Sequence, residues 1–202
     1  MESFSIFTGR KASRRMMKKA AAGGLASLGR KRNIALIGFM ASGKTSTARK
    51  MAALSGMEMV EIDDEVEKAA GMKIAEIFGR KGERHFRKLE RAEIAKAAGR
   101  KNAVISCGGG AVLDPKNAKA LQENCVVVWL WAGPDEIMRR VGADSSRPLL
   151  NVKGRRKRVK SLLAARLESY ACCADLIVST GNEKPEGIAR LILDEMHKTF
   201  ED

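Results

Sequence analysis

The segment Gly-Phe-Met-Ala-Ser-Gly-Lys-Thr at residues 38–45 constrains the fold of this chain more than any other. It matches the pattern G-x-x-x-x-G-K-[ST] and lies between a short apolar run and a helical pattern, as a phosphate-binding loop requires. Gly38 and Gly43 permit backbone torsions that point successive N–H groups at an anion. Lys44 can reach the β and γ phosphates, and the Thr45 hydroxyl can ligate Mg²⁺. The segment therefore predicts ATP or GTP binding, and its full spacing fits a purely structural Gly-rich turn less well.

Five short apolar runs alternate with longer amphipathic stretches along the chain. The predicted strands are Ile34–Ile37, Met59–Ile62, Ala103–Cys107, Val126–Trp131 and Leu176–Ser179. Several are apolar at consecutive positions, which is typical of strands covered on both faces of a parallel sheet. Helical patterns lie between them, including Glu83–Ala98 and a last helix whose first turn contains Pro185. The alternation predicts an α/β fold with right-handed crossovers.

Charge and composition narrow the class of protein without identifying its ligand. The 202 residues include 38 Lys and Arg against 24 Asp and Glu, a net charge of +14 that predicts attraction to anions. No apolar run approaches the roughly 20 residues that a membrane-spanning helix needs. The four cysteines and two histidines have no metal-ligand spacing. We therefore expect reduced thiols in an intracellular, cytoplasmic protein.

Residues 1–32 are predicted to form a basic, flexible extension ahead of a domain at 33–202. Through residue 33 the chain has nine basic side chains, one acidic side chain and only two aromatic ones. A stacking surface for single-stranded nucleic acid is therefore poorly supported. The pair Arg14-Arg15 ahead of an uncharged stretch leaves a twin-arginine export signal open, and the basic composition leaves an organelle transit peptide open.

Acidic and glycine-rich segments follow the second and third predicted strands. Glu61 and Asp63 lie at the carboxyl end of a strand, where ligands gather in α/β folds, and a carboxylate there can orient a Mg²⁺-bound water or accept a hydroxyl proton. Alternatively, Asp63 or Asp64 caps a helix. The run Gly108-Gly109-Gly110 indicates either a ligand lying against the main chain or a sharp turn alone.

With these residues, the chain resembles the shikimate kinase family from Asn33 to about Met196. The matching segments are 38–45, Glu61-x-Asp63, Gly82-Glu83-x-x-Phe86-Arg87, Gly108-Gly109-Gly110, Arg147-Pro148-Leu149-Leu150 and Arg166-x-x-x-Tyr170. The resemblance implies a P-loop kinase fold of the nucleoside-monophosphate-kinase type, with a five-stranded parallel sheet flanked by helices. It also implies transfer of the ATP γ-phosphoryl group to the 3-hydroxyl of shikimate, in aromatic amino-acid biosynthesis. The expected ligands are ATP, Mg²⁺ and shikimate, and the expected protein is a monomer with no specific nucleic-acid or membrane partner.

The resemblance further implies which residues act in catalysis. Asp63 would accept a hydrogen bond from the attacking hydroxyl and act as the base. Lys44 would neutralise charge on the phosphates, and Arg147, in a mobile lid at about 142–156, would stabilise the transferred phosphoryl group. Thr45 and Glu61 would hold Mg²⁺.

Binding residues follow from the same resemblance. Arg87 and Arg166, on two different helices, would hold the shikimate carboxylate, since a planar guanidinium fork suits a planar anion. Asp63 and the main chain of Gly108, Gly109 and Gly110 would also contact this substrate. Residues expected to bind the nucleotide are Gly38, Ala41, Ser42, Gly43, Lys44, Thr45, Ser46, Arg140, Arg147 and Pro185. Within that set, Arg140 and Pro185 match the positions that sandwich adenine.

Two positions depart from the family pattern. Glu61 stands where the family has Asp, and its extra methylene is expected to shift the contact with a Mg²⁺-bound water without abolishing activity. Ala41 stands where family members often have Gly, and its methyl group is expected to be tolerated if the residue has a negative φ. Cys107 is expected to pack as a small side chain near the site.

Two other functions compete with this interpretation. A related kinase for gluconate or nucleotides would share the fold and the phosphate-binding loop, although Arg87, the three glycines and Arg166 favour a carboxylated polyol. A noncatalytic nucleotide-binding protein would use its basic N-terminus to contact a partner or nucleic acid. Lost catalysis is disfavoured by the retention of Lys44, Thr45, Asp63 and Arg147.

Overall fold

The computed structural model describes residues 33–141, 154–181 and 183–200. The predicted extension at 1–32, most of the predicted lid and Arg147 lie outside these ranges. The elements, in chain order, are β1 (Asn33–Ile37), α2 (Lys44–Ser55), β2 (Glu58–Glu61), α3 (Ile62–Ala70), α4 (Ile74–Ala98), β3 (Ala103–Ser106), the 3₁₀ turn η2 (Ala111–Leu113), α5 (Pro115–Asn124), β4 (Cys125–Trp131), α6 (Pro134–Val141), α7 (Arg155–Cys173), β5 (Leu176–Ser179) and α8 (Pro185–Phe200).

The five strands form one parallel sheet in the order β2-β3-β1-β4-β5. This arrangement confirms the predicted α/β fold. Strand β1 lies at the centre, and all five of its residues are buried. Its apolar positions are consecutive because helices cover both faces of the sheet, so neither face is left to solvent.

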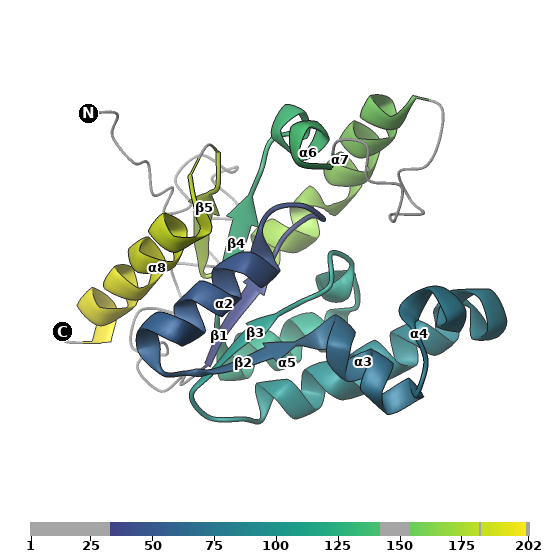
Figure 1. Ribbon diagram of the computed structural model, residues 1–202, viewed down its shortest axis with the longest axis horizontal. Coiled ribbons are helices and arrows are strands. Elements are labelled where there is room, and N and C mark those ends of the chain that lie inside the picture. The colour runs from purple at the N-terminus through teal and green to yellow at the C-terminus, as the bar shows by residue number, and fades with distance from the viewer. Residues whose placement is uncertain (1–32, 142–153, 182, 201–202) are drawn as a thin grey trace.

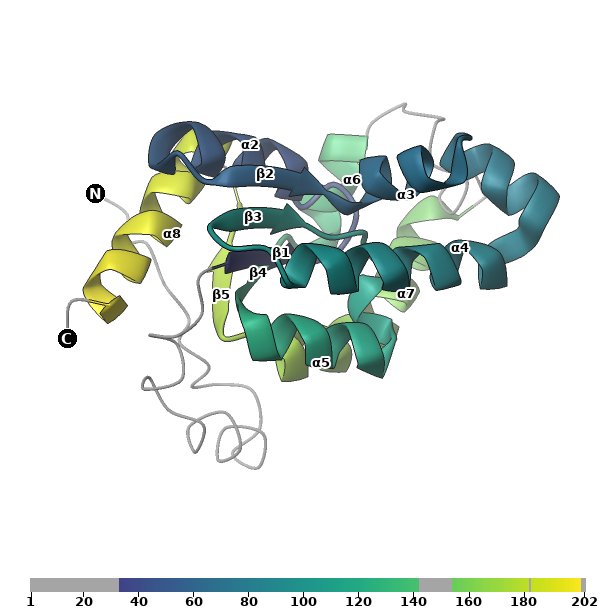
Figure 2. The same cartoon turned by 90° about the horizontal axis from the view of Figure 1, so that it is seen from below.

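Alternate residues of β1 face two separate cores. Ile34 and Leu36 pack in a core with residues of α2 and α8, whereas Ala35 and Ile37 pack in a core with residues of α4, α5 and α7. Figures 1 and 2 show α2 and α8 together on one side of the sheet and α4, α5 and α7 on the other. The period-two alternation of a strand thus divides one apolar run between two helical layers.

Several strand boundaries differ from the sequence prediction by one residue. Ile62 is the first residue of α3 rather than the end of a strand. The range of α4 contains two helical segments separated by a non-helical residue, Gly82, where φ is 78° and ψ is 170°. The second segment therefore begins at Glu83, as predicted. Cys107 lies just beyond β3. Helix α8 begins at Pro185, as predicted.

Within the described ranges, none of the helices has both the length and the apolar character that crossing a membrane requires.

Candidate active site

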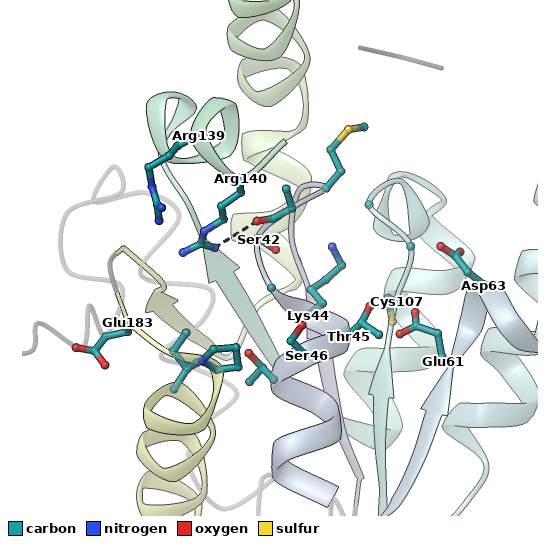
Figure 3. A pocket seen from close by; sticks show the side chains of 18 residues that line it. Ser42, Lys44, Thr45, Ser46, Glu61, Asp63, Cys107, Arg139, Arg140 and Glu183 are labelled. Atoms are coloured by element: carbon teal, nitrogen blue, oxygen red, sulfur yellow. Dashed lines mark hydrogen bonds between the residues drawn. The ribbon is translucent and has the colours of Figure 1, made fainter. Parts of the chain in front are cut away.

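The carboxyl ends of β1, β3 and β2 lie side by side in the sheet. In the strand register, Leu36 pairs with Ser106, and Ser106 pairs with Glu61. Each strand continues directly into a segment that the sequence singled out, so parallel pairing delivers all three segments to one edge. They line a cavity of about 690 Å³. Figure 3 shows the side chains around it.

The phosphate-binding loop supplies one wall of the cavity. Gly38 and Gly43 have positive φ angles of 138° and 94°, which an L side chain rarely adopts. A Cβ atom on Gly38 would also lie 2.5 Å from the carbonyl oxygen of Leu130. The buried Lys44 ammonium donates hydrogen bonds of 2.9 Å to the carbonyl oxygens of Gly38 and Phe39. The loop therefore holds the Lys44 ammonium close to the N-terminus of helix α2, and the helix N-terminus itself also favours a bound anion.

The backbone of Ala41 does not meet the condition set from the sequence. Its φ is +59°, in the left-handed region, and not negative. The Ala41 side chain is tolerated at this position only at the cost of backbone strain, which for a residue other than glycine is of order 1–2 kcal/mol. The loop thus keeps the backbone shape that suits glycine while carrying a methyl group.

Two carboxylates approach the phosphate-binding loop from the end of β2 and the start of α3. Burial, the largest cause, raises the pKa of Asp63, and the nearby charge of Lys44 opposes the rise. Burial also raises the pKa of Glu61, and the side chains of Thr45 and Ser106 beside it oppose that rise. Figure 3 shows Glu61 and Thr45 on the same side of the cavity. A raised pKa suits Asp63 for accepting a proton.

Neither aspartate at the start of α3 caps the helix. Glu61 occupies the N-cap position without a capping hydrogen bond from its side chain, and Asp63 and Asp64 lie within the first turn. The capping alternative is therefore wrong. Acidic residues in a first turn still favour the helix through its dipole.

Each of the three consecutive glycines faces a different part of the site. A Cβ atom on Gly108 would lie 3.1 Å from Asp63 Oδ1 and 3.0 Å from Glu90 Oε1. One on Gly109 would lie 3.3 Å from the Met40 backbone nitrogen, and one on Gly110 would lie 2.8 Å from Nη2 of an arginine on α4. The run is therefore more than a sharp turn, because carboxylates, the phosphate-binding loop and a guanidinium all approach its main chain closely.

The α4 guanidinium belongs to Arg87, which is 30% exposed and pairs with acids of its own helix. Its Nη1 donates to Glu90 Oε2 at 2.7 Å, and its Nη2 donates to Glu83 Oε1 at 3.1 Å. Glu90 is 1% exposed, its Oε1 has no hydrogen-bond partner among the described residues, and burial raises its pKa. Glu90 therefore fixes one edge of the Arg87 guanidinium from inside the protein.

The second predicted arginine reaches the same glycine run from α7. Arg166 Nη1 donates to the Gly109 carbonyl oxygen at 3.1 Å, and its guanidinium lies 5.5 Å from the centroid of the Phe39 ring. The buried Tyr170, one turn further along α7, donates its hydroxyl to the same carbonyl at 2.5 Å. Because Gly109 and Gly110 are adjacent, Arg166 and Arg87 converge on one loop from two helices.

Most of the predicted site residues meet in the cavity. Those that line it are Ala41, Ser42, Gly43, Lys44, Thr45, Ser46, Glu61, Asp63, Gly108, Gly109, Arg140 and Pro185, together with Cys107. Cys107 is buried, as expected. Gly38, Gly110, Arg87 and Arg166 are not among the lining residues and join the site through the contacts given above. Arg147 lies outside the described residues.

Sequence reasoning assigned no role to Glu90 or Tyr170. Glu90 follows Arg87 by three residues in a helical pattern, and that spacing permits an ion pair. Tyr170 follows Arg166 by four, which places the two side chains on one helix face. Both spacings are common in ordinary helices, so only the tertiary contacts reveal their importance.

Comparisons with known proteins agree with the resemblance seen in the sequence. The family model for shikimate kinase matches residues 40–197. The shikimate kinase of Caldanaerobacter subterraneus subsp. tengcongensis is 41% identical over 162 residues, covering 80% of this chain and 94% of that protein. The shikimate kinase of Moorella thermoacetica is 41% identical over 169 residues, covering 84% and 96%. Among solved structures, shikimate kinase from Acinetobacter baumannii in complex with shikimate has a TM-score of 0.80 at 30% identity, covering 87% of this chain and 98% of that one.

Proposed function

The chain belongs to the shikimate kinase family, and we propose that it transfers the γ-phosphoryl group of ATP to the 3-hydroxyl of shikimate. The observation that carries this proposal is the convergence of Arg87 and Arg166 on the glycine run beside Asp63. Two guanidiniums that approach the glycine run beside a cavity with a phosphate-binding loop fit an acceptor bearing both a carboxylate and a hydroxyl group. Family membership also argues against the alternatives of a gluconate or nucleotide kinase and of a noncatalytic binding protein.

In this proposal, the acceptor is held by its carboxylate. Arg87 has one edge fixed by the buried Glu90, whereas its partner on the other edge, Glu83, is 66% exposed. A substrate carboxylate can replace the exposed Glu83 partner while Glu90 keeps the guanidinium in place. Arg166 is oriented by the Gly109 carbonyl, which Tyr170 also fixes. The main chain of the glycine run then lies against the substrate ring.

Asp63 is the proposed base. Its Oδ1 lies next to Gly108, and the opposing charge of Lys44 lies on the phosphate side of the same cavity. The carboxylate can accept a hydrogen bond from the attacking hydroxyl and take its proton as the new P–O bond forms. Lys44 stabilises the negative charge that moves toward the leaving oxygen of ADP.

The residues at the end of β2 fit a divalent cation. Glu61 Oε2 is buried and has no hydrogen-bond partner among the described residues, and oxygen ligands suit Mg²⁺. Thr45 and Glu61 would hold the ion. When bound, Mg²⁺ supplies charge neutralisation between the β and γ phosphates. The roles of Arg147, the adenine contacts, the monomeric state, the cytoplasmic location and the absence of nucleic-acid and membrane partners stay predictions.

The test is ADP release by the full chain with ATP and Mg²⁺, measured in parallel with shikimate, with gluconate and without an acceptor. We expect release to depend on shikimate, and ³¹P NMR of the product to place the phosphate on the 3-oxygen. A shikimate analogue without the 3-hydroxyl is the matched control and should not be phosphorylated. Equal turnover with gluconate, or release that no acceptor stimulates, would contradict the proposal.

A further inference from the structure

Ala41 adopts a backbone conformation that alanine disfavours. Among the described residues, the only other non-glycine residue with positive φ is Asn102, at 62°. Asparagine enters the left-handed region several times more often than most residues, so Asn102 needs no special support. Ala41, at 59°, does need support, because such strain persists only where surrounding structure enforces it.

The strained residue is in the part of the loop that receives phosphates. Ala41 is followed by Ser42 and by Gly43, which is also left-handed at 94°. Left-handed residues next to right-handed ones turn successive N–H groups toward one point and so create a concave anion site. If Ala41 relaxed to a right-handed or extended conformation, this concave row of donors would be lost. Anion binding by the loop therefore depends on its least favourable residue.

Arg140, on α6, bonds to the carbonyl oxygen of this residue. Figure 3 shows its side chain reaching from α6 to the loop, with the bond dashed. The guanidinium makes five hydrogen bonds: Nε donates to Glu136 Oε1, Nη1 to Ala41 O at 3.2 Å and Thr180 Oγ1 at 3.0 Å, and Nη2 to Thr180 O at 3.1 Å and Gly181 O at 2.6 Å. A guanidinium has five N–H donors, so all are in use. Arg140 keeps no N–H for a phosphate oxygen, and only its flat faces are available to a ligand.

The four hydrogen bonds other than that to Ala41 fix the position of the Arg140 guanidinium. Thr180 is fully buried, and its backbone N–H and hydroxyl both donate to the Trp131 carbonyl, at 2.8 Å and 3.1 Å. Glu136 lies one turn before Arg140 on α6 and is 14% exposed. The bond to Ala41 therefore joins the loop to a well-supported group.

We propose that Arg140 is a positioning residue that holds Ala41 in its left-handed conformation and so keeps the phosphate-binding loop shaped for anions. It does this through the hydrogen bond that Nη1 donates to the Ala41 carbonyl oxygen, while its other N–H groups donate to protein acceptors rather than to substrate or phosphate. The same guanidinium joins the loop to Thr180 and Gly181. These residues are close in sequence to Pro185, which lines the cavity and is expected to contact the adenine ring. The inference rests on the proposed function only in requiring that the loop bind nucleotide phosphates.

The penalty for left-handed backbone sets the size of the expected effect. If Arg140 no longer holds the carbonyl, the strained loop relaxes, and the fraction of molecules ready to bind falls by about five- to thirtyfold. Glycine has no such penalty, so the same loss should matter little when residue 41 is glycine. The two substitutions are therefore expected to be strongly non-additive.

The experiment is a double-mutant cycle on the full chain. Binding of inorganic tripolyphosphate with Mg²⁺ is measured by calorimetry for the wild type, Arg140→Lys, Ala41→Gly and the double variant. Lysine keeps the charge but cannot reach five acceptors. Arg140→Lys should weaken binding about five- to thirtyfold in the Ala41 background and less than about twofold in the Ala41→Gly background. Arg80→Lys is the matched control, because Arg80 pairs with Glu76 one turn before it on α4 and neither residue lines the cavity of the phosphate-binding loop. This variant should bind tripolyphosphate as the wild type does.

Equal weakening in both backgrounds, or none in either, would overturn the inference while leaving the proposed function standing. A wild type that binds neither tripolyphosphate nor ATP would overturn both. If Arg140→Lys does not fold, Thr180→Val serves in its place, because it removes one Nη1 acceptor and keeps the side-chain shape. It should weaken tripolyphosphate binding in the Ala41 background more than in the Ala41→Gly background, and additive behaviour would again contradict the inference.

Discussion

The nucleotide end and the acceptor end of the cavity are built in different ways. The phosphate-binding loop is one continuous segment that offers mainly backbone groups and Lys44. The acceptor end is assembled from the start of α3, the middle of α4, the glycine run and α7, and it offers mainly side chains. A local segment can be identified from spacing, whereas an assembled site depends on how distant segments pack.

The arginines of the two ends show the same contrast. Arg140 uses all its donors on protein acceptors, chiefly backbone carbonyls of other segments. Arg87 bonds to two acids of its own helix, and one of those, Glu83, is exposed. Carbonyl partners that belong to the fold are not exchanged for a ligand, whereas an exposed carboxylate partner can be. This contrast supports the proposals that Arg140 acts as a structural support and that Arg87 binds a substrate carboxylate.

The largest effect is expected at the nucleotide end. Lys44→Ala should lower kcat by about 10³- to 10⁵-fold, because the transferred phosphoryl group loses its neutralising cation. Circular dichroism on the same sample should show an intact fold. Near-normal turnover in a folded variant would show that the loop does not act as this comparison assumes.

The next largest effect is expected for Asp63, the proposed base, whose carboxylate lies between the nucleotide end and the acceptor end of the cavity. Asp63→Asn should lower kcat by about 10²- to 10⁴-fold, since an amide cannot take the proton. In the wild type, kcat should fall as pH decreases through the raised pKa of Asp63, because only the ionised form is a base. If Asp63→Asn kept substantial activity and its kcat still fell at low pH as in the wild type, another group would be the base.

The same substitution has a predictable effect on stability. Because folding raises the pKa of Asp63 above its ordinary value of 3.8, the folded state binds more protons than the unfolded state between the two values. The ionised carboxylate therefore costs stability, fully so above the raised pKa. Asp63→Asn should raise Tm at neutral pH, and its advantage should shrink toward pH 3.8 and below. Thermal melts of both proteins across this range check the sign.

A smaller effect is expected for the arginines of the acceptor end. Arg87→Lys or Arg166→Lys keeps the charge but removes the planar fork, and a charge-assisted bond is worth about 1.5–3 kcal/mol. Shikimate binding should weaken about tenfold to a hundredfold, while binding of an ATP analogue should barely change. Calorimetric titration with each ligand measures this selectivity. If both ligands weakened equally, the two ends would not be independent.

The smallest effect concerns a glycine of the acceptor end. A Cβ atom on Gly110 would lie 2.8 Å and 2.9 Å from the two Nη atoms of Arg87, so Gly110→Ala must push the guanidinium aside. A displaced group of this kind should weaken shikimate binding by about threefold to tenfold and leave nucleotide binding unchanged. Gly79→Ala is the control, because a Cβ atom on Gly79 meets nothing within 4 Å. Equal effects of the two substitutions would show that Gly110 does not position Arg87.

Several features could be predicted from the sequence because they depend on neighbouring residues. The strand, loop and helix around residues 38–45 are fixed by a local pattern of glycines and apolar residues, and the structure has them in that order. Pro185 begins α8 because its ring suits a first helical turn. Gly82 separates the two parts of α4 with a non-helical φ of 78° and ψ of 170°, which is the break that a glycine in a helical pattern can indicate.

The sequence by itself determined the order of strands and helices, the phosphate-binding loop and the family resemblance. Each of these depends on patterns of residues that lie close together in the chain. Only the tertiary structure decided the conformation of Ala41, the full use of the Arg140 donors, the burial of Glu90 and the bond from Tyr170 to Gly109. The partners in these contacts, apart from Glu90 with Arg87 and Arg140 with Glu136, are separated by long stretches of chain. Their meeting depends on which strand lies next to which, and no local pattern specifies that.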